Sequence, residues 1–195
     1  PKTKSAPSVF LSPEQIQLPL RHCSVSWLRL AIELSFVCTL RRGELLALRW
    51  DDINWEQNSL QISKTLCRVS KDAMLMLEER DVLHVFPTEA HSKTVLVLKS
   101  PKTESSNRIV YLPPSLKYSL LEWQNEQKKS AIGELPRLIF AYEDNRPLQS
   151  GVLTKYFQRL LAKCNLPKVT FHSLRHSSIT YKLVLTGGDI KAVQG

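Results

Sequence analysis

Apolar side chains occupy nearly every face of the segment Ser26–Leu40, and this pattern predicts a central buried helix. Another helix is expected just before it, because Ser12 can cap a helix that starts at Pro13, with Gln15 three residues after the cap. Pro19 is expected to kink this helix or to end it early. The first part of the chain is therefore predicted to be helical behind a short leader.

Helical and strand-like patterns alternate along the rest of the chain. Further helices are expected over residues 41–50, 114–129, 150–164 and 172–185. Alternating or β-branched residues predict strands over residues 60–69, 95–99 and 109–112, and a short strand over 138–142 that a turn at 144–147 closes. A turn cluster at 100–107 separates the second and third strands, which are expected to form a hairpin with Lys102 near its tip. The predicted fold is α+β and mostly α-helical, with one small antiparallel β-sheet or hairpin on one side.

The composition is that of a folded domain. The chain has 195 residues, 43% of them hydrophobic and four of them tryptophan, which is enough to bury the core of one domain. We expect residues 1–11 to be a flexible leader and residues 12–195 to form that domain. No apolar run approaches the roughly 18–20 residues that a membrane span needs, so a soluble protein is predicted.

The cysteines and the N-terminus bear on the compartment. The four cysteines are far apart in the sequence and form no Cys-x-x-Cys pair, so they are expected to be reduced, mostly buried thiols. The polar N-terminus lacks the apolar segment of a signal peptide, which favours a cytoplasmic protein. Because the chain lacks an initiator Met and ends as a new amphipathic segment begins, we expect it to be a piece of a longer protein.

The charge balance favours a polyanionic partner. Lys and Arg number 27 against 18 Asp and Glu, which gives a formal net charge of +9. Such an excess attracts nucleic acid or another polyanion without identifying which one. Against this background, three polar clusters are candidates for chemistry.

The first cluster follows the buried helix. One of the adjacent arginines Arg41 and Arg42 is expected at the edge of the core, held by Glu44 or by a bound anion, because an unpaired charge there is costly. The alternative is an Arg–Glu pair that only caps a junction between helices.

The second cluster is Phe-His-Ser-Leu-Arg-His at residues 171–176. His172 and Arg175 are three positions apart and share one helical face near a helix N-terminus, where amide groups and the helix dipole attract phosphate. His172 and His176 also have the spacing of a zinc helix. Arg175 between them repels a cation, however, and the glutamate of the hydrolytic zinc motif is Ser173 here, so no metal site is predicted.

The third cluster surrounds the predicted hairpin. Lys93, Lys99, Lys102 and Arg108 are near one another in the sequence there, and loops of this kind present functional side chains. The alternative is a solvated edge hairpin, which charged side chains protect from pairing with other strands.

Taken in chain order, these clusters resemble the catalytic domain of tyrosine recombinases, the phage integrase family. The resemblance rests on Arg-x-Gly-Glu-Leu at residues 41–45, Pro-Lys-Thr at 101–103 and His-x-Leu-Arg-His at 172–176. Residues 48–53 and 188–194 also agree, so the resemblance covers nearly the whole chain. The chain looks most similar to integrases of temperate phages and of conjugative transposons of Gram-positive bacteria.

This resemblance implies a DNA breaking-rejoining fold and a reaction that uses no metal and no cofactor. In the reaction, a tyrosine attacks a phosphodiester of double-stranded DNA and forms a 3′-phosphotyrosyl link. The catalytic residues implied are Arg41, Lys102, His172 and Arg175. The two arginines would hold the phosphate, the histidine would bond the phosphate and take the tyrosine proton, and the lysine would protonate the leaving 5′ oxygen.

Other residues receive supporting roles from the same resemblance. Glu44 would orient an active-site arginine. Contacts to DNA are implied for Arg42, Lys99, Thr103, Arg108 and His176. The four catalytic residues are expected to converge on one concave basic surface, and the protein is expected to act as a multimer at recombination sites, in the bacterial cytoplasm and at the nucleoid.

The attacking tyrosine is the point where the chain departs from the family. In the family it follows the last stretch of resemblance, after a further active-site His or Trp, and both are expected to lie outside these 195 residues. The tyrosines present are Tyr111, Tyr118, Tyr142, Tyr156 and Tyr181. Tyr181 comes nearly two helical turns after Arg175 and is expected to serve in packing. The chain by itself is therefore predicted to be inactive, without the N-terminal domain that completes the clamp on DNA.

Two other functions remain open at this point. One is a non-catalytic DNA-binding or regulatory module that retains the phosphate-binding residues. The other is a type IB topoisomerase, which shares the fold and the chemistry but relaxes DNA without joining partners. The agreement over residues 41–52 favours an integrase over a topoisomerase.

Overall fold

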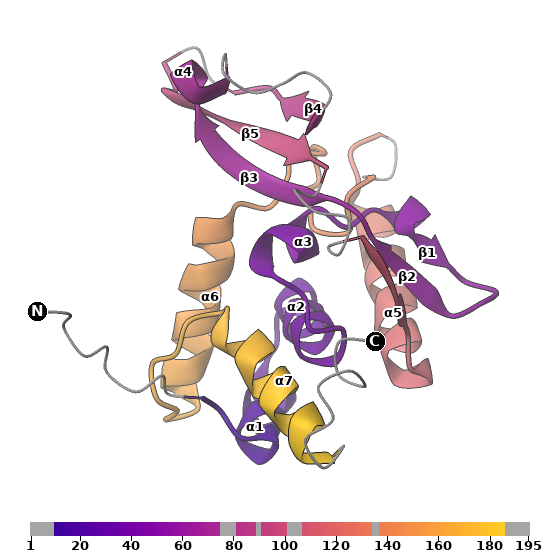
Figure 1. Cartoon of the computed structure of the whole chain (residues 1–195), viewed down its shortest axis with the longest axis vertical. Helices are drawn as coiled ribbons and strands as arrows, with labels where there is room; N and C mark the ends of the chain where they lie inside the picture. The colour runs from indigo at the N-terminus through magenta and orange to yellow at the C-terminus, as the bar shows by residue number, and fades with distance from the viewer. Residues whose placement is uncertain (1–9, 75–80, 89–90, 101–106, 134–136, 186–195) are drawn as a thin grey trace, which may run out of the picture. The chain divides into compact units, whose positions relative to one another are not determined.

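The structure is a computed structural model that describes residues 10–74, 81–88, 91–100, 107–133 and 137–185 (Figure 1). The chain divides into two compact units. The first unit joins Pro1–Arg41 to Gly151–Gly195, and the second is the continuous segment Arg42–Ser150. Helices predominate and the strands pair antiparallel, so the predicted α+β class is confirmed.

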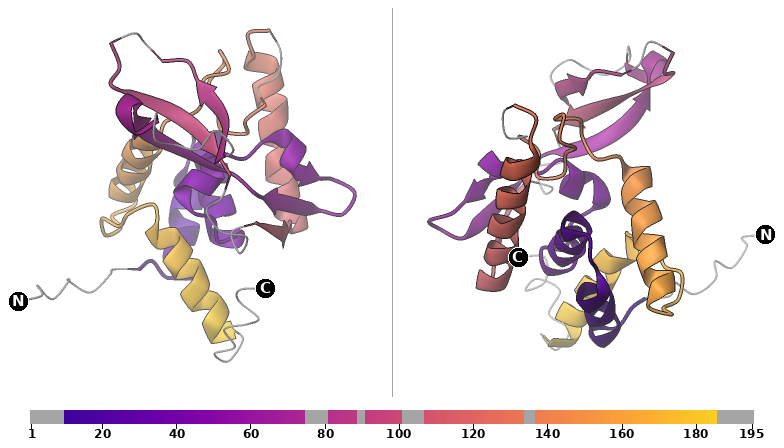
Figure 2. Two further views of the ribbon diagram at one scale, coloured as in Figure 1. Left: turned by 45° about the horizontal axis from the view of Figure 1, so that its top comes forward. Right: turned by 180° about the vertical axis from the view of Figure 1, so that it is seen from behind.

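Four helices build the first unit: α1 (Pro13–His22), α2 (Ser26–Val37), α6 (Ser150–Lys163) and α7 (Ser173–Leu185) (Figure 2). The start of α1 is as predicted, because the Ser12 hydroxyl accepts from the Gln15 amide at 3.2 Å and the Gln15 side chain accepts from the Ser12 amide at 2.9 Å. Pro19 does not end α1 early, since the helix continues to His22. Pro19 is buried within the helix, where it cannot donate a backbone hydrogen bond.

The core of the first unit forms around α2, which is buried as its apolar sequence predicts. Its buried apolar residues are Leu28, Leu30, Ala31, Ile32 and Leu34. Ring contacts tie α2 to its neighbours, with centroids 5.2 Å apart for Trp27 and Tyr156 of α6, and 6.3 Å apart for Phe36 and Tyr181 of α7. The helix ends at Val37, earlier than the predicted Leu40.

The second unit holds two three-stranded antiparallel sheets, where the sequence predicted one. The first sheet has the order β1-β2-β6, and its strands are β1 (Ile53–Asn54), β2 (Ser59–Ile62) and β6 (Arg108–Tyr111). The second has the order β3-β5-β4, and its strands are β3 (Thr65–Ser70), β5 (Thr94–Lys99) and β4 (Val82–Phe86). Sequence reasoning missed β4, an edge strand whose Leu83 and Val85 are exposed, so it lacks the alternation of a half-buried strand.

The predicted hairpin between residues 95–99 and 109–112 is wrong. Strand β5 pairs with β3, with Lys99 opposite Thr65, whereas β6 pairs with β2, with Arg108 opposite Ile62. The strands β5 and β6 thus belong to different sheets, although only eight residues separate them in the sequence (Figure 1). A connection of that length exceeds the usual hairpin loop of two to five residues, so longer-range pairing determined the topology.

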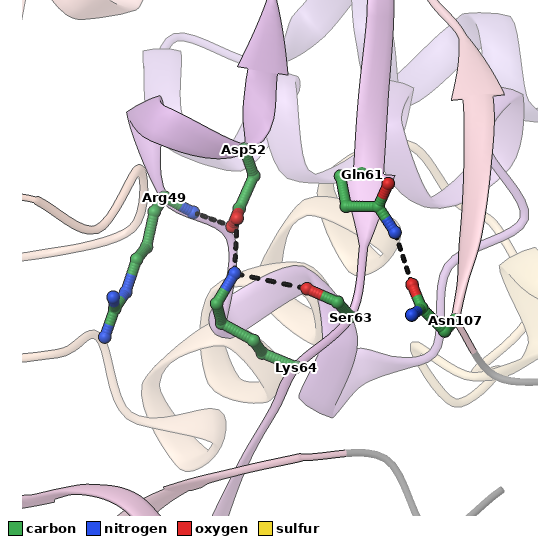
Figure 3. Close-up of polar contacts among 6 residues, drawn as sticks. All are labelled: Arg49, Asp52, Gln61, Ser63, Lys64 and Asn107. Atoms are coloured by element: carbon green, nitrogen blue, oxygen red, sulfur yellow. Dashed lines mark hydrogen bonds and ion pairs between the residues drawn. The ribbon is translucent and has the colours of Figure 1, made fainter. Parts of the chain in front are cut away.

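Strand β2 ends at Ile62 and β3 begins at Thr65, and a polar network holds the two residues between them, Ser63 and Lys64 (Figure 3). The Lys64 ammonium donates to the Asp52 carboxylate and, at 3.2 Å, to the Ser63 hydroxyl. Asp52 belongs to the short 3-10 helix η1 (Trp50–Asp52), and its other carboxylate oxygen accepts from the Arg49 amide at 2.9 Å. This network joins the two sheets to the segment that precedes β1.

Helix α5 (Pro114–Ser130) packs beside the first sheet and agrees with the predicted helix. Its Lys117 donates to the Trp55 carbonyl at 2.9 Å and to the Asn58 side chain at 2.6 Å, and the Trp50 indole donates to Gln127 at 3.0 Å. The short α3 (Arg42–Leu46) and α4 (Lys71–Met74) complete the unit. The helix predicted over 41–50 therefore ends sooner than expected.

The predicted strand over residues 138–142 forms only two isolated bridges. These join Arg49 to Leu138 and Ala141 to Pro147. The turn that follows is as predicted, with the Tyr142 amide donating to the Arg146 carbonyl at 2.8 Å.

Candidate active site

The end of α2 places the first candidate arginine. The Cys38 amide donates to the Leu34 carbonyl at 2.9 Å and closes the last turn, after which Thr39 adopts a left-handed backbone with φ 55°. A β-branched residue is strained there and keeps this conformation only where surrounding contacts hold it. Arg41 follows two residues later and is exposed.

Helix α7 supplies the contacts that hold Thr39. The Arg175 guanidinium donates to the Thr39 carbonyl, and the Ser178 and Thr39 hydroxyls are 3.1 Å apart. The Lys182 ammonium donates to the Val37 carbonyl at 3.0 Å and to the Thr39 hydroxyl at 2.9 Å. Cationic side chains at a helix C-terminus satisfy its last carbonyls and oppose its negative end. The Arg175 side chain is therefore bonded to Thr39, which lies two residues before Arg41 in the chain.

Sequence reasoning missed three members of this junction: Thr39, Ser178 and Lys182. The two on α7 follow Arg175 by three and seven positions, the spacing of a single helical face, so the pattern of polar residues was available as a signal. For Thr39 there was no signal, because its role depends on a backbone angle and on a partner far along the chain.

His172 and His176 lie together at the N-terminus of α7. Their ring centroids are 4.7 Å apart in an edge-to-face contact, and the Phe10 ring lies 5.8 Å from that of His176. Both imidazoles are exposed, and α7 begins at Ser173, so His172 immediately precedes the helix. Contacts of this kind orient aromatic rings, and the amide groups of a helix N-terminus favour an anion.

Glu44 has a partner that sequence reasoning did not consider. Arg108 of β6 donates to a carboxylate oxygen of Glu44 at 2.9 Å, and only 7% of the Glu44 side chain and 19% of the Arg108 side chain are exposed. The pair connects α3 to the first sheet of the second unit. It gives Glu44 a structural role in addition to the orienting role that the resemblance implied.

The glycine of the Arg-x-Gly-Glu motif is required by close packing. A Cβ atom on Gly43 would lie 2.4 Å from the Thr65 hydroxyl oxygen and 3.1 Å from the Leu66 carbonyl oxygen. Helix α3 therefore approaches β3 so closely that no larger residue fits without a shift of the backbone. This approach brings Glu44 to its position.

The remaining predicted site residues divide between the units. Arg42 is exposed at the start of α3, and Lys99 is half-buried at the end of β5. Lys102 and Thr103 lie outside the described residues. The first unit holds Arg41, His172, Arg175 and His176, and the second holds Arg42, Glu44, Lys99 and Arg108. Their convergence on one surface stays a prediction.

Tyr181, on the same helix as Arg175, makes a packing contact, although the residue is 39% exposed and does not belong to the core. Its ring stacks on Phe36 at an interplanar angle of 28°. Tyr118 is also exposed, on α5, where a hydrogen bond to Glu122 and that carboxylate's charge raise the pKa of its hydroxyl. A raised pKa makes the phenol a weaker source of the attacking oxyanion.

The cysteines correct one expectation. All four are free thiols, but only Cys38 is buried, so the prediction of mostly buried thiols is wrong. Burial raises the pKa of the half-exposed Cys23, which makes its thiol less reactive. In the described part of the chain, no three His, Cys, Asp or Glu side chains gather to hold a metal ion, and no helix there is long and apolar enough to span a membrane.

Comparison with known proteins identifies relatives over nearly the whole chain. The family model described as phage integrase family matches residues 10–195. A protein named tyrosine recombinase XerC-like, from Caldanaerobacter subterraneus subsp. tengcongensis, is 27% identical over 168 residues, which cover 82% of this chain and 39% of that protein.

Solved structures share the fold. The Tn1549 transposon integrase, in complex with a circular intermediate DNA, superposes with a TM-score of 0.75 at 22% identity, over 100% of this chain and 58% of that one. The lambda integrase bound to DNA gives a TM-score of 0.58 at 20% identity, over 97% of this chain and 56% of that one. The chain thus spans less than two thirds of each of these relatives.

Proposed function

The chain belongs to the phage integrase family, and we propose that it is part of a site-specific DNA recombinase that integrates or excises a mobile element. The observation that carries this proposal is the bond from Arg175 to the Thr39 carbonyl, two residues before Arg41. This bond joins the segment that carries Arg41 to the helix that carries Arg175, both within the first unit. The partner proposed is double-stranded DNA, bound by a multimer at recombination sites inside a bacterial cell.

In the proposed reaction, a tyrosine oxygen attacks the scissile phosphorus, the bond to the 5′ oxygen breaks, and a 3′-phosphotyrosyl link forms. The transition state gathers negative charge on the non-bridging oxygens, and preorganised donors stabilise that charge. The guanidinium groups of Arg41 and Arg175 suit this task because their planar donors can bind two phosphate oxygens at once.

Proton transfer falls to two other residues in this proposal. His172, exposed at the N-terminus of α7, would bond the phosphate and accept the tyrosine proton, because an imidazole nitrogen can act as a general base. Lys102 would give a proton to the leaving 5′ oxygen. Glu44 would act through its partner Arg108 by fixing the strand that follows the Lys102 segment. The attacking tyrosine is proposed to lie outside these 195 residues.

The experiment that tests strand cleavage traps the covalent intermediate. The full-length protein is incubated, in the presence of a chelator, with nicked duplexes that carry the ends of the element that encodes it. A nick next to the cleavage site lets the leaving strand diffuse away, so the link accumulates. A protein–DNA band on a denaturing gel is expected, and its absence from every such duplex would contradict the proposal.

DNA binding is expected to depend steeply on salt. A chain with net charge +9 displaces counterions from DNA, so its affinity for duplex should fall by roughly 10³-fold or more between about 50 and 200 mM salt, with little sequence preference. Fluorescence anisotropy with two unrelated duplexes measures both properties. An affinity that does not change with salt would show that the basic residues do not contact phosphates.

A further inference from the structure

The second unit contains a cavity of about 450 Å³ that involves none of the proposed catalytic residues. Three arginines, Arg49, Arg137 and Arg146, line this cavity. His84 and Phe86, from the end of β4, line it as well. Its volume falls within the range of small-molecule sites, roughly 300–1,000 Å³.

Backbone hydrogen bonds join the two segments that carry Arg49 and Arg137. Arg49 forms a β-bridge with Leu138, and hydrogen bonds flank the bridge, from the Trp50 amide to the Arg137 carbonyl at 3.1 Å and from the Ile139 amide to the Leu48 carbonyl at 2.9 Å. The two strands of this bridge place Arg49 and Arg137 in the wall of one cavity. The backbone that carries them is therefore fixed before any ligand arrives.

Neither of these guanidinium groups has an acidic partner among the residues that the structure describes. Asp52, three positions after Arg49, accepts from the Arg49 backbone amide and from Lys64 and makes no contact with the Arg49 guanidinium. Figure 3 shows the Arg49 side chain extending away from Asp52. The positive charges of Arg49 and Arg137 are thus available to an anion.

The third arginine of the cavity is already neutralised. Arg146 donates to Asp144 at 2.6 Å, and its guanidinium lies 5.8 Å from the centre of the Tyr142 ring. Desolvation alone would raise the pKa of Asp144, but hydrogen bonds from Arg146 and its charge keep that pKa below its ordinary value. Asp144 therefore stays ionised and cancels the charge of Arg146, so that among the described residues only Arg49 and Arg137 contribute uncompensated positive charge to the cavity.

Two aromatic side chains and a proline complete the wall of the cavity. The rings of His84 and Phe86 meet edge-to-face with centroids 4.6 Å apart, and Pro87 continues this wall. Phe86 is half-buried, so its ring is already positioned by the protein. Aromatic faces of this kind stack with nucleobases of any sequence.

From this arrangement we propose that the cavity binds a nucleoside phosphate. The phosphate lies between Arg49 and Arg137, whose guanidinium forks match its oxygens, and the base packs against Phe86 and His84. A free nucleotide and a single nucleotide of an unpaired strand share this chemistry. The site goes beyond the proposed recombinase function, because it uses none of the residues assigned to strand cleavage.

The test measures binding of two probes to the full-length protein by isothermal titration calorimetry. The probes are adenosine 5′-monophosphate and a short 5′-phosphorylated oligothymidylate. Arg137→Gln and Arg49→Gln are each expected to weaken binding by about tenfold or more, and Phe86→Leu by several-fold. The matched control is Arg159→Gln, which removes the same charge from an exposed position on α6, outside the cavity.

The outcomes distinguish a free nucleotide from a nucleotide of an unpaired strand, or they show that the cavity binds neither. Binding of the mononucleotide, weakened in Arg137→Gln and unchanged in Arg159→Gln, supports a free nucleotide. Binding of the oligonucleotide alone, with the same response to the variants, supports a nucleotide of a strand. The proposal is overturned if neither probe binds or if Arg159→Gln weakens binding as much as Arg137→Gln. Arg49→Gln repeats the test should Arg137→Gln alter the fold, which circular dichroism detects.

Discussion

Arg175→Ala in the full-length protein is expected to slow DNA cleavage by roughly 10²–10³-fold, the usual cost of removing one preorganised donor to a developing oxyanion. Affinity for duplex DNA should change far less, because each arginine is one among many contacts to phosphate. Single-turnover formation of the covalent intermediate gives the cleavage rate, and anisotropy gives the affinity.

Lys182→Met is the matched control for this variant. Lys182 and Arg175 both donate hydrogen bonds to Thr39. Removal of the Lys182 ammonium therefore weakens the same junction between α2 and α7. It has no proposed contact with the phosphate, so its cleavage rate should stay within a few-fold of the wild type. Equal cleavage losses in the two variants would show that Arg175 acts only by supporting the junction.

Glu44→Ala is expected to destabilise the protein by roughly 3 kcal/mol, because it leaves the Arg108 guanidinium largely buried without its carboxylate. Urea unfolding monitored by tryptophan fluorescence measures the change. The double variant Glu44→Ala/Arg108→Ala should lose less than the sum of the two single variants, since it removes both charges together.

Asp144→Ala is the control for this prediction, within the same unit. It also breaks an arginine–carboxylate pair, but that pair is largely exposed, so little change in stability is expected. If Glu44→Ala unfolds at the same urea concentration as Asp144→Ala, the pair of Glu44 and Arg108 contributes no more than a surface contact.

The helices were predictable because their signals are local. The cap at Ser12, the apolar segment that became α2 and the periodic segments that became α5, α6 and α7 each carry their pattern within a dozen or so residues. The strand pairing was not predictable in this way. Strand β5 pairs with β4 and with β3, which precedes it by almost thirty residues, whereas the turn cluster after β5 suggested a pairing with the next strand.

The candidate site shows the same division. Its residue types were read from motifs, whereas the partners of those residues depend on tertiary contacts. Arg175 bonds to the carbonyl of a threonine with a left-handed backbone, and Glu44 pairs with an arginine sixty-four positions away. Neither contact leaves a trace in the spacing of the motifs. The same holds for Gly43, whose close approach to Thr65 and Leu66 appears only in the structure.

Identifying the residue that becomes linked to DNA decides whether a tyrosine outside these 195 residues cleaves the strand. The covalent product of the full-length protein, formed in the presence of a chelator, is digested with protease and nuclease, and the modified peptide is sequenced by mass spectrometry. The account predicts a nucleotide joined through its 3′ phosphate to a tyrosine outside these 195 residues. A link to Tyr111, Tyr118, Tyr142, Tyr156 or Tyr181, or to a residue other than tyrosine, would contradict it.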